Sequence, residues 1–436
     1  MNDKKAVVIG GGLAGVEAAK QLSKKGVKVT LYEMKPRKFS PAHKSEKLAE
    51  LVCSNSLKAE RVGSAAGLLK AEMSLFGSVC VDAAYKAKVP AGGALAVDRD
   101  VFSDEITKSI ENDENITLVR EEITEIPSEG IVIIAAGPLV SDSLAQKIGE
   151  LCGKDFLSFY DAAAPIVTAD SIDMENAFTQ SRYDRGGEDD YINCPLDKAQ
   201  YEEFYEALVN AESADLHSFD KRKDVYEGCM PIEVLASRGK DAMRYGPLKP
   251  VGLTNPKTGH RPWANLQLRK ENKDGTMYNL VGFQTNLKFP EQKRVFSMFP
   301  ALKNAEFVRY GVMHRNTFLN SPGLLSYDFS LKKEPRIYFA GQISGVEGYM
   351  ESASSGILAG YNAARRIFGE EPILLPKITM MGALSQYISD ETVKNFQPMG
   401  AAFGIIDPLD ERIKDKKERY ETLAKRSLDY FKTIDL

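Results

Sequence analysis

Apolar and polar positions follow one another along the chain in blocks that predict strands and helices in alternation. Residues 6–9 form a short apolar run that predicts a buried strand, and a helical pattern follows from about 14 to 25. Gly26 ends that pattern, and the apolar run at 27–32 predicts a second strand. Strand, helix and strand in this order are typical of the βαβ unit of a parallel sheet.

Similar blocks continue to about residue 160 and return near residue 335. Apolar runs at 131–135 and 336–340 predict buried strands, and shorter strands are expected at 95–99, 116–119 and 123–126. Helical patterns cover 68–76, 101–111 and 350–368, and a charged amphipathic helix is expected beyond residue 407. The blocks therefore predict an α/β fold with a Rossmann-like domain.

The stretch between these blocks has a different texture. It combines polar strands, a helix near 197–211 and loops rich in Pro and Gly, and it gathers basic and aromatic residues. We therefore expect an inserted α+β domain at 161–300, which would carry substrate or RNA contacts. The two parts of the Rossmann-like domain would then span 1–160 and 301–436.

Composition narrows the class of protein. With 43% hydrophobic and 27% charged residues among 436, the chain is an ordinary globular protein. No apolar run approaches the roughly 18 residues of a membrane span, and the first strand begins too early to leave room for a signal peptide. The five cysteines form no C-x-x-C pair, so neither a disulfide framework nor a metal site is predicted, and a cytoplasmic location is expected. Because the net charge is −4, a nucleic-acid partner would need a local basic surface.

The turn after the first strand has the spacing G-x-G-x-x-G of dinucleotide-binding proteins. The first glycine allows a tight turn, the second lets the backbone approach a pyrophosphate, and the third lets helix and strand pack closely. The following helix offers unpaired N–H groups to the phosphates, and Glu33 would accept the ribose hydroxyl groups. The predicted cofactor-binding residues here are Gly10, Gly11, Gly12, Leu13, Ala14, Gly15 and Glu33.

The C-terminal block favours FAD over a nicotinamide cofactor. A second glycine-bearing strand leads through Gly341 and Gln342 into a helix with Ser352, Ser355 and Gly356 near its start. Such a helix can direct its N-terminus at the pyrimidine edge of an isoalloxazine, although a βα unit packed only for structure fits the same residues. No second G-x-G-x-x-G is present, so a separate NAD(P)H domain is not predicted. The expected architecture is thus a glutathione-reductase-type FAD-binding domain.

Two cysteines lie in turns that could make them reactive. Cys53 lies in the sequence Leu-Val-Cys-Ser-Asn-Ser, and Cys229 lies between Gly228 and Pro231. Cysteine attacks as the thiolate, which needs an electropositive or helix-end setting, whereas an isolated cysteine is more often a small buried hydrophobe. The second interpretation is expected for Cys80, Cys152 and Cys194.

Two further stretches are dense in functional side chains. His314 and Arg315 could stack on a flat heteroaromatic ring, although a structural strand end explains them equally well. Glu347 and Glu351 frame a glycine-flanked loop before the last long helix, where a carboxylate could bind a pterin or flavin edge.

Several stretches together resemble the folate- and FAD-dependent tRNA (uracil-5-)-methyltransferases, within the larger group of glucose-inhibited-division type tRNA-modifying flavoproteins. They run along the whole chain: VVIGGGLAGVEAA, LVCSNSL, ALAVDRDVFS, EGCMPIEVLASRG, RYGPLKPVGL, YGVMHRNTF and IYFAGQISGVEGYMESASSGILAG. The resemblance implies that 5,10-methylenetetrahydrofolate gives its one-carbon unit to C5 of a uridine in the tRNA T loop. Reduced FAD would take part, with NADH or NADPH as reductant.

The resemblance also assigns roles to individual residues. Cys229 would attack uracil C6, and Cys53 would abstract a proton or handle the one-carbon unit beside the flavin. His314 and Arg315 would contact the pterin, with Glu347 and Glu351 as further folate contacts. In the inserted domain, tRNA phosphates would be bound by Arg238, Arg244 and Lys249, and a base would stack on Trp263.

Other functions fit parts of the same pattern. A related flavoprotein could methylate ribosomal RNA or modify a wobble uridine, and the Cys-Ser-Asn-Ser turn and the length of 436 residues count against the wobble enzymes. A non-catalytic flavin- or RNA-binding protein is a third reading, against which the intact Cys53, Cys229 and His314 count. The sequence leaves open the choice of NADH or NADPH, the division of roles between the two cysteines and the oligomeric state.

Overall fold

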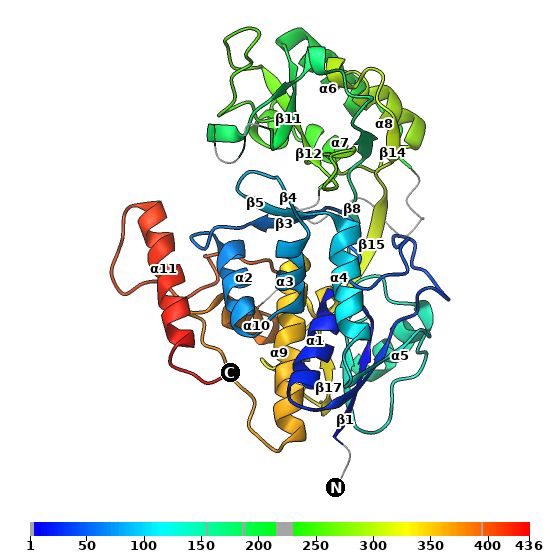
Figure 1. The fold of residues 1–436 in the computed structure, drawn as a ribbon, viewed down its shortest axis with the longest axis vertical. Helices are drawn as coiled ribbons and strands as arrows, with labels where there is room; N and C mark the ends of the chain where they lie inside the picture. Colours follow the sequence, from blue (N-terminus) through cyan, green and yellow to red (C-terminus); the bar gives the residue numbers. More distant parts are fainter. Residues whose placement is uncertain (1–3, 154–155, 185–186, 188, 215–229, 394–395) are drawn as a thin grey trace.

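The structure is a computed structural model that describes residues 4–153, 156–184, 187, 189–214, 230–393 and 396–436. Figure 1 shows two lobes stacked along the long axis, with helix α11 projecting from the side of the lower lobe. The lower lobe contains both the first and the last parts of the chain. None of the described helices is long and apolar enough to span a membrane.

The lower lobe is built on a six-stranded sheet with the strand order β16-β17-β7-β1-β2-β6. The five strands from β17 to β6 are parallel, and only β16 pairs antiparallel, at the edge. In the centre, Val8 pairs with both Leu31 and Ile133, and all three side chains are fully buried, which explains their apolar runs. The strands are β1 (Lys5–Ile9), β2 (Lys28–Tyr32), β6 (Ile116–Val119), β7 (Ile131–Ile134), β16 (Ser330–Leu331) and β17 (Glu334–Phe339).

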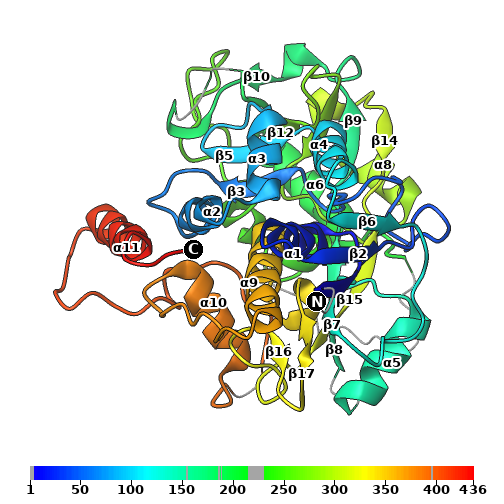
Figure 2. The ribbon, with the colours of Figure 1, turned by 60° about the horizontal axis from the view of Figure 1, so that its bottom comes forward.

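Helices α1 (Leu13–Lys24) and α9 (Tyr349–Ile367) lie side by side against this sheet (Figure 2). They approach closely because Gly356 and Gly360 face the backbone of Ala14 and Ala18, leaving no room for side chains between them. The remaining helices of this lobe are α2 (Ala65–Leu75), α3 (Val79–Lys86), α4 (Arg99–Glu111), α5 (Asp142–Cys152), α10 (Met380–Ser389) and α11 (Lys416–Phe431). A small sheet of β3 (Ser56–Ala59), β5 (Ala94–Val97) and β4 (Lys88–Val89) covers their upper end.

The upper lobe has a second, antiparallel sheet and its own hydrophobic core. Its strand order is β10-β11-β12-β13-β9-β14, formed by β9 (Ile166–Thr168), β10 (Phe178–Thr179), β11 (Tyr191–Leu196), β12 (Ala264–Lys270), β13 (Met277–Leu280) and β14 (Phe307–Arg309). The helices α6 (Lys198–Val209), α7 (Ile232–Ala236) and α8 (Phe289–Phe296) complete this lobe. Short 3-10 helices occur at Met174–Asn176, Arg182–Asp184, Ala242–Tyr245, Pro300–Leu302 and, in the lower lobe, Gln342–Ser344.

A two-stranded antiparallel ribbon joins the lobes. It consists of β8 (Phe156–Ala162) on the way in and β15 (Met313–Leu319) on the way out. All strands of the upper sheet, β9 to β14, lie between β8 and β15 along the chain. We therefore infer that the inserted domain lies between the two ribbon strands, at about 163–312.

The predicted α/β fold is confirmed, and the structure differs from the expectation in details. The strand expected at 123–126 is wrong: this stretch is irregular, and Glu121, Glu122 and Ile123 line a cavity instead. It follows β6, which lies at the edge of the sheet and has a hydrogen-bonded neighbour strand on one side only. Helices α3 and α5 were not predicted, and α2 begins three residues before the expected start at residue 68.

Candidate functional site

A cavity of about 410 Å³ opens where the parallel strands of the lower lobe end. Its wall includes residues directly after β1, β2, β7 and β17, which all end at the same edge of the sheet. In open parallel sheets this edge is the usual place for a ligand. Twelve of the residues predicted from the sequence line the cavity: Gly10, Gly11, Gly12, Leu13, Ala14, Glu33, Cys53, Gly341, Gln342, Glu347, Glu351 and Ser352.

The glycine turn forms an open cradle in the wall of this cavity. Gly10 has φ +106°, and a Cβ there would lie 2.4 Å from the carbonyl oxygen of Ala135. A Cβ at Gly12 would meet no atom within 4 Å, so this position is open toward the cavity. The N–H groups of Leu13 and Ala14, in the first turn of α1, have no acceptor within the helix, and no side chain caps it. The turn therefore fits the pyrophosphate of a dinucleotide.

Glu33 holds the turn from the end of β2. Its Oε2 accepts a hydrogen bond from the N–H of Gly11 at 3.0 Å, and its Oε1 accepts one from the N–H of Lys35 at 2.9 Å. Each carboxylate oxygen can accept a second hydrogen bond, so the group can still bind ribose hydroxyls.

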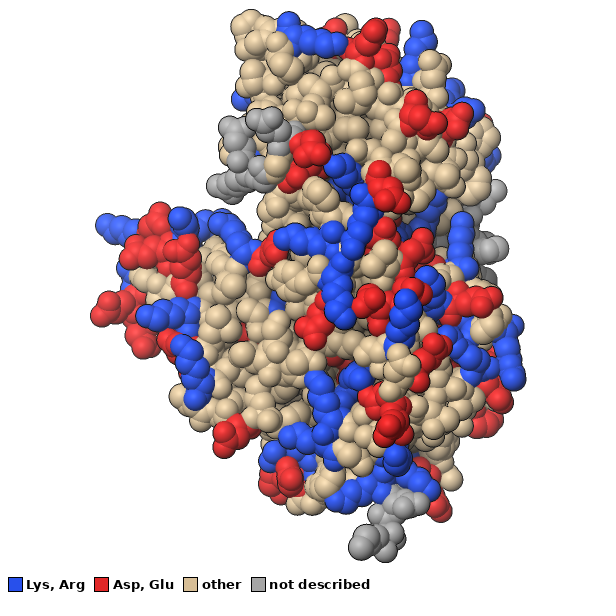
Figure 3. All heavy atoms as spheres, in the orientation of Figure 1, with Lys and Arg blue, Asp and Glu red and all other residues tan. Residues whose placement is uncertain are grey.

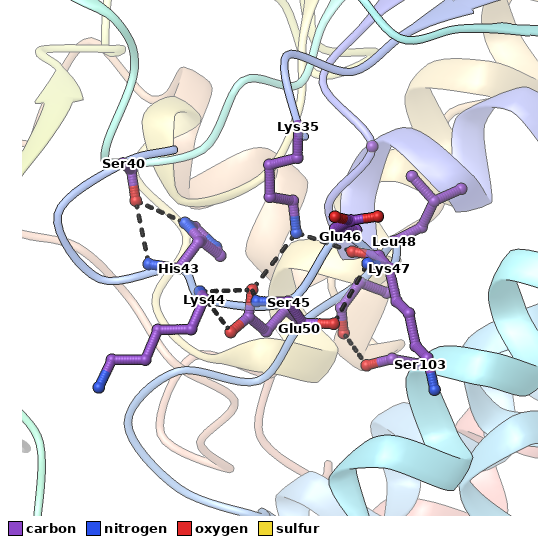
Figure 4. Close-up of polar contacts among 12 residues, drawn as sticks. Lys35, Ser40, His43, Lys44, Ser45, Glu46, Lys47, Leu48, Glu50 and Ser103 are labelled. Atoms are coloured by element: carbon purple, nitrogen blue, oxygen red, sulfur yellow. Dashed lines mark hydrogen bonds and ion pairs between the residues drawn. The ribbon is translucent and has the colours of Figure 1, made fainter. Parts of the chain in front are cut away.

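The loop after Glu33 forms the rim of the same cavity (Figure 4). Lys35 Nζ donates to the carbonyl of Lys47 at 2.7 Å and lies 3.3 Å from Glu50 Oε2. Ser40 Oγ and His43 Nδ1 are 2.6 Å apart. Burial, followed by the charge of Lys35, lowers the pKa of His43, so its ring is neutral at physiological pH. Sequence reasoning missed Lys35, His43 and Glu50, because no motif distinguishes this loop.

Cys53 lies at the cavity beside the hydroxyl group of Tyr349, the first residue of α9. The hydroxyl oxygen accepts hydrogen bonds from the N–H groups of Cys53, at 2.8 Å, and Ser54, at 3.2 Å. It also lies 3.0 Å from Cys53 Sγ. A hydroxyl has two acceptor positions and one proton, and because the two N–H groups occupy both acceptor positions, the proton is available for donation to the sulfur. Burial raises the pKa of Tyr349 well above its usual range, which keeps that proton in place.

Two predicted carboxylates, Glu347 and Glu351, lie at the start of α9. Gln342 Nε2 is 3.0 Å from both carboxylate oxygens of Glu347. Glu351 is almost fully buried, and its Oε1 accepts hydrogen bonds from Lys58 Nζ at 2.7 Å and from the N–H of Ala401 at 2.9 Å. The segment around residue 400 thus contacts Glu351 from outside the cavity lining, which no local sequence pattern indicated.

Three predicted cofactor residues serve helix packing in the structure. A Cβ at Gly15 would lie 1.8 Å from the carbonyl oxygen of Gly10, and one at Gly356 would lie 2.1 Å from that of Ala14. Ser355 Oγ accepts a hydrogen bond from the N–H of Gly341 at 2.7 Å. These residues therefore set the positions of the glycine turn and of Gly341, which themselves line the cavity.

Three predicted residues are described only in part or not at all. His314 and Arg315 belong to β15, where their backbones pair with Asp161 and Tyr160, and their side chains lie outside the described part of the structure. Cys229 also lies outside the described residues. Three residues further on, the N–H of Ile232 donates to the carbonyl of Gln284 at 2.7 Å, and Gln284 lines the cavity.

The predicted RNA-binding residues lie on the upper lobe. The Arg244 guanidinium stacks over the Trp263 ring at 3.9 Å and donates through Nε to the Trp263 carbonyl at 3.0 Å. Arg238 and Lys249 are exposed and lie within six residues of Arg244 in the sequence. Tyr245, which was not among the predicted RNA-binding residues, is 85% exposed. On the face shown in Figure 3, basic and acidic side chains are interspersed, so charge alone does not outline an RNA site.

Comparisons with known proteins agree with this architecture. The family model described as "Glucose inhibited division protein A" matches residues 5–371. The chain is 58% identical over 425 residues to the methylenetetrahydrofolate–tRNA-(uracil-5-)-methyltransferase TrmFO of Acetivibrio thermocellus, covering 98% of this chain and 97% of the relative. It is 55% identical to the enzyme of the same name from Desulforamulus reducens, covering 99% and 98%.

A solved structure shows the same fold. GidA of Aquifex aeolicus superposes with a TM-score of 0.71 at 18% identity, covering 99% of this chain and 73% of that one. The similarity to the two methyltransferases extends over nearly the full length of both chains. The chain therefore belongs to the TrmFO family of methylenetetrahydrofolate–tRNA-(uracil-5-)-methyltransferases, within the group described by the glucose inhibited division protein A model.

Proposed function

We propose that the protein transfers the one-carbon unit of 5,10-methylenetetrahydrofolate to C5 of the T-loop uridine of tRNA, giving 5-methyluridine. FAD would be the resident cofactor, NADH or NADPH the reductant, and the cytoplasm the place of action. The relatives that are 53–58% identical to this chain are methylenetetrahydrofolate–tRNA-(uracil-5-)-methyltransferases, which supports the reaction. The observation that carries the proposal is that Cys53 and the glycine cradle share one cavity.

The residues of this cavity fit FAD. The N–H groups at the start of α1 would bind the pyrophosphate, Glu33 would bind the ribose, and Gly341 leaves space at the end of β17. When bound, FAD supplies the redox chemistry that the reduction of a methylene to a methyl group requires. The remaining task of the protein is to hold uridine and folate at the open end of the cavity, near Cys53, Gln342 and Glu347.

Cys229 would activate the uridine. Uracil C5 is a poor nucleophile until a thiolate adds to C6, which moves the C5–C6 electron pair onto C5 and O4. After the new bond at C5 has formed, a base removes the C5 proton, and the electron pair left at C5 expels the group that carried the one-carbon unit, which leaves a methylene group at C5. Two-electron reduction of this methylene gives the methyl group, and the C5–C6 double bond forms again as the Cys229 thiolate leaves C6. Cys53 is our candidate for the base that removes the C5 proton. Among the described residues, Ile232 follows Cys229 by three positions and donates to the carbonyl of Gln284, which lines the cavity.

Turnover with defined RNAs tests the proposal. The purified protein is incubated with methylene-labelled methylenetetrahydrofolate, NADPH or NADH, and an unmodified tRNA transcript, and labelled 5-methyluridine is measured after nuclease digestion. We expect label in the transcript, none after Cys53→Ala or Cys229→Ala, and normal turnover after Cys194→Ala, whose thiol is fully buried in β11.

Two controls separate this function from its alternatives. A transcript with cytidine in place of the T-loop uridine should gain no label, and neither should a ribosomal RNA fragment. Label in the ribosomal fragment alone would refute the tRNA assignment, and a protein without turnover on any RNA would refute the catalytic one.

A further inference from the structure

A cluster of arginines lies beneath the Cys53 turn, at the contact between the lobes. Arg99 belongs to α4 of the lower lobe, whereas Arg269 (β12) and Arg309 (β14) belong to the upper lobe. Glu271, which directly follows the strand end of β12, is 4% exposed and forms an ion pair with Arg99. We call these four residues the arginine cluster.

Two members of the cluster bind the Cys53 turn from both sides. Arg99 Nη1 donates to the carbonyl oxygens of Leu51, at 2.8 Å, and Val52, at 3.0 Å, just before the cysteine. Arg269 donates through Nη2 to Ser54 Oγ and through Nε to Asn55 Oδ1, both at 3.0 Å, just after it. The Asn55 side chain in turn donates to the carbonyl of Lys270 at 2.9 Å. The upper lobe thereby fixes the turn that carries the thiol.

The charges of the cluster do not cancel. Three guanidinium groups face the carboxylates of Glu271 and, next to it, Asp98, which leaves at least one excess positive charge. Burial raises the pKa of Glu271, and the three arginines oppose that shift. Burial, and then the charge of Arg99, lower the pKa of Arg309, which interacts with Glu271, Tyr349 and Cys53. An anion beside this cluster would be stabilised, because charges interact strongly in a poorly solvated site.

The thiol is the group placed to become that anion. The sulfur lies 3.0 Å from the Tyr349 hydroxyl oxygen, and Cys53 interacts with the charge of Arg309. Arg99 and Arg269 bind polar groups of the turn before and after the cysteine, and Glu271 and Asp98 lie next to these arginines. The Tyr349 hydroxyl can donate its proton to the sulfur, and a thiolate accepts such a bond better than a thiol does.

We propose that Arg99, Arg269 and Arg309 are positioning residues that, together with the Tyr349 hydroxyl, hold Cys53 as a thiolate directed into the cavity. Since two of the three arginines come from the upper lobe, contact between the lobes favours the thiolate. The importance of this state for catalysis rests on the proposed function, but the state itself can be measured without turnover.

Alkylation of Cys53 by iodoacetamide measures the thiolate directly, because the thiolate forms the S–C bond and iodide leaves. The experiment uses the full-length Cys229→Ser protein, and peptide mass spectrometry follows Cys53 across a pH series. Arg309→Met removes charge while keeping the bonds of Arg99 and Arg269, since in the described part of the chain the Arg309 side chain donates none to the turn. We expect the midpoint of its rate profile to rise by about one pH unit, a roughly tenfold loss of thiolate near neutral pH.

Three further variants sharpen the result. Arg309→Lys keeps the charge, so the midpoint of its rate profile should stay close to that of the parent protein. Arg182→Met removes another half-buried arginine of the upper lobe, bonded to Gln267 and the Val251 carbonyl, and should leave the midpoint unchanged. Should Arg309→Met not fold, Tyr349→Phe tests the same thiolate and should also raise the midpoint.

An unchanged midpoint in both Arg309→Met and Tyr349→Phe would overturn the proposal, and so would an equal shift in Arg182→Met. The proposed function can fail separately: a shifted midpoint in a protein that methylates no RNA would leave the thiolate in place and remove its assigned use.

Discussion

Gly12→Ala should weaken FAD binding strongly while leaving the fold intact. Gly12 has φ −75° and ψ −175°, an extended conformation that alanine adopts without strain, and its added methyl group would meet no protein atom within 4 Å. The methyl group would instead enter the cavity in front of the N–H groups of Leu13 and Ala14. A phosphate could then no longer approach these groups.

The structure sets the size of the effect. Hydrogen bonds to charged groups contribute about 1.5–3 kcal/mol each, so losing two weakens FAD binding by about 3–6 kcal/mol. That corresponds to a roughly 10²- to 10⁴-fold higher Kd. The free energy of unfolding of the cofactor-free protein should change by no more than about 1 kcal/mol, because a poorer helix cap is offset by a stiffer unfolded chain.

Gly356→Ala is the matched variant with the opposite outcome. Its methyl group would lie 2.1 Å from the Ala14 carbonyl oxygen and 2.7 Å from Ala14 Cα, so α1 and α9 must move apart. Overpacking of this kind costs about 1–3 kcal/mol, which denaturant unfolding of the cofactor-free protein would show. Titration of both variants with FAD, followed by flavin fluorescence, completes the comparison. Gly12→Ala binding FAD as tightly as the parent would refute the cradle, and an undisturbed Gly356→Ala would refute the packing argument.

Three other outcomes follow from buried charges and exposed rings. Burial raises the pKa of Glu72 from 4.5 to about 7. The stability that this group contributes is therefore complete below pH 4.5, and about 3 kcal/mol of it is lost as the pH rises through 7. Glu72→Gln should flatten this part of the pH profile of the unfolding free energy, and an unchanged profile would contradict the argument. Lys58→Met leaves the buried Glu351 carboxylate without its cation and should cost about 1–2 kcal/mol in thermal unfolding, against under about 0.5 kcal/mol for Lys88→Met, which breaks an exposed pair. Arg244→Ala should weaken tRNA binding and reduce the slope of log K against log salt by about one, whereas Arg294→Ala on α8 should not, and equal slopes would argue against RNA contacts at Arg244.

The central sheet was predictable because its strands are buried on both faces. Continuous apolar runs indicated β1, β2, β7 and β17, and the glycine spacing indicated the turn that lines the cavity. The stretch at 123–126 carries similar residues, yet it follows the edge strand β6 along the chain and pairs with no strand in the described part of the structure. Apolar composition alone does not report whether a partner is available.

The surroundings of Cys53 were not predictable, because they come from distant parts of the chain. Tyr349 follows the cysteine by almost 300 residues, and Arg269 and Arg309 belong to the other lobe. Tyr349 lies in one of the stretches that carry the family resemblance, but nothing in that stretch pairs it with Cys53, and Arg269 and Arg309 lie in none of them. Gly15, Ser355 and Gly356 were predicted from motifs to bind the cofactor. In the structure, their contacts instead fix the glycine turn, Gly341 and the packing of α1 against α9.

The pairing of α1 with α9 has a consequence for synthesis on the ribosome. The glycine turn leaves the ribosome early, but Gly341, Tyr349 and Gly356 follow more than 330 residues later. At about 5–20 residues per second, the turn waits roughly 20 to 70 seconds for its partners. The last strand of the upper sheet, β14, is synthesised before these residues, so the whole upper sheet leaves the ribosome ahead of them. Cofactor capture is therefore expected to be among the last events in the maturation of the chain, after the lobe with the RNA-binding candidates has already folded.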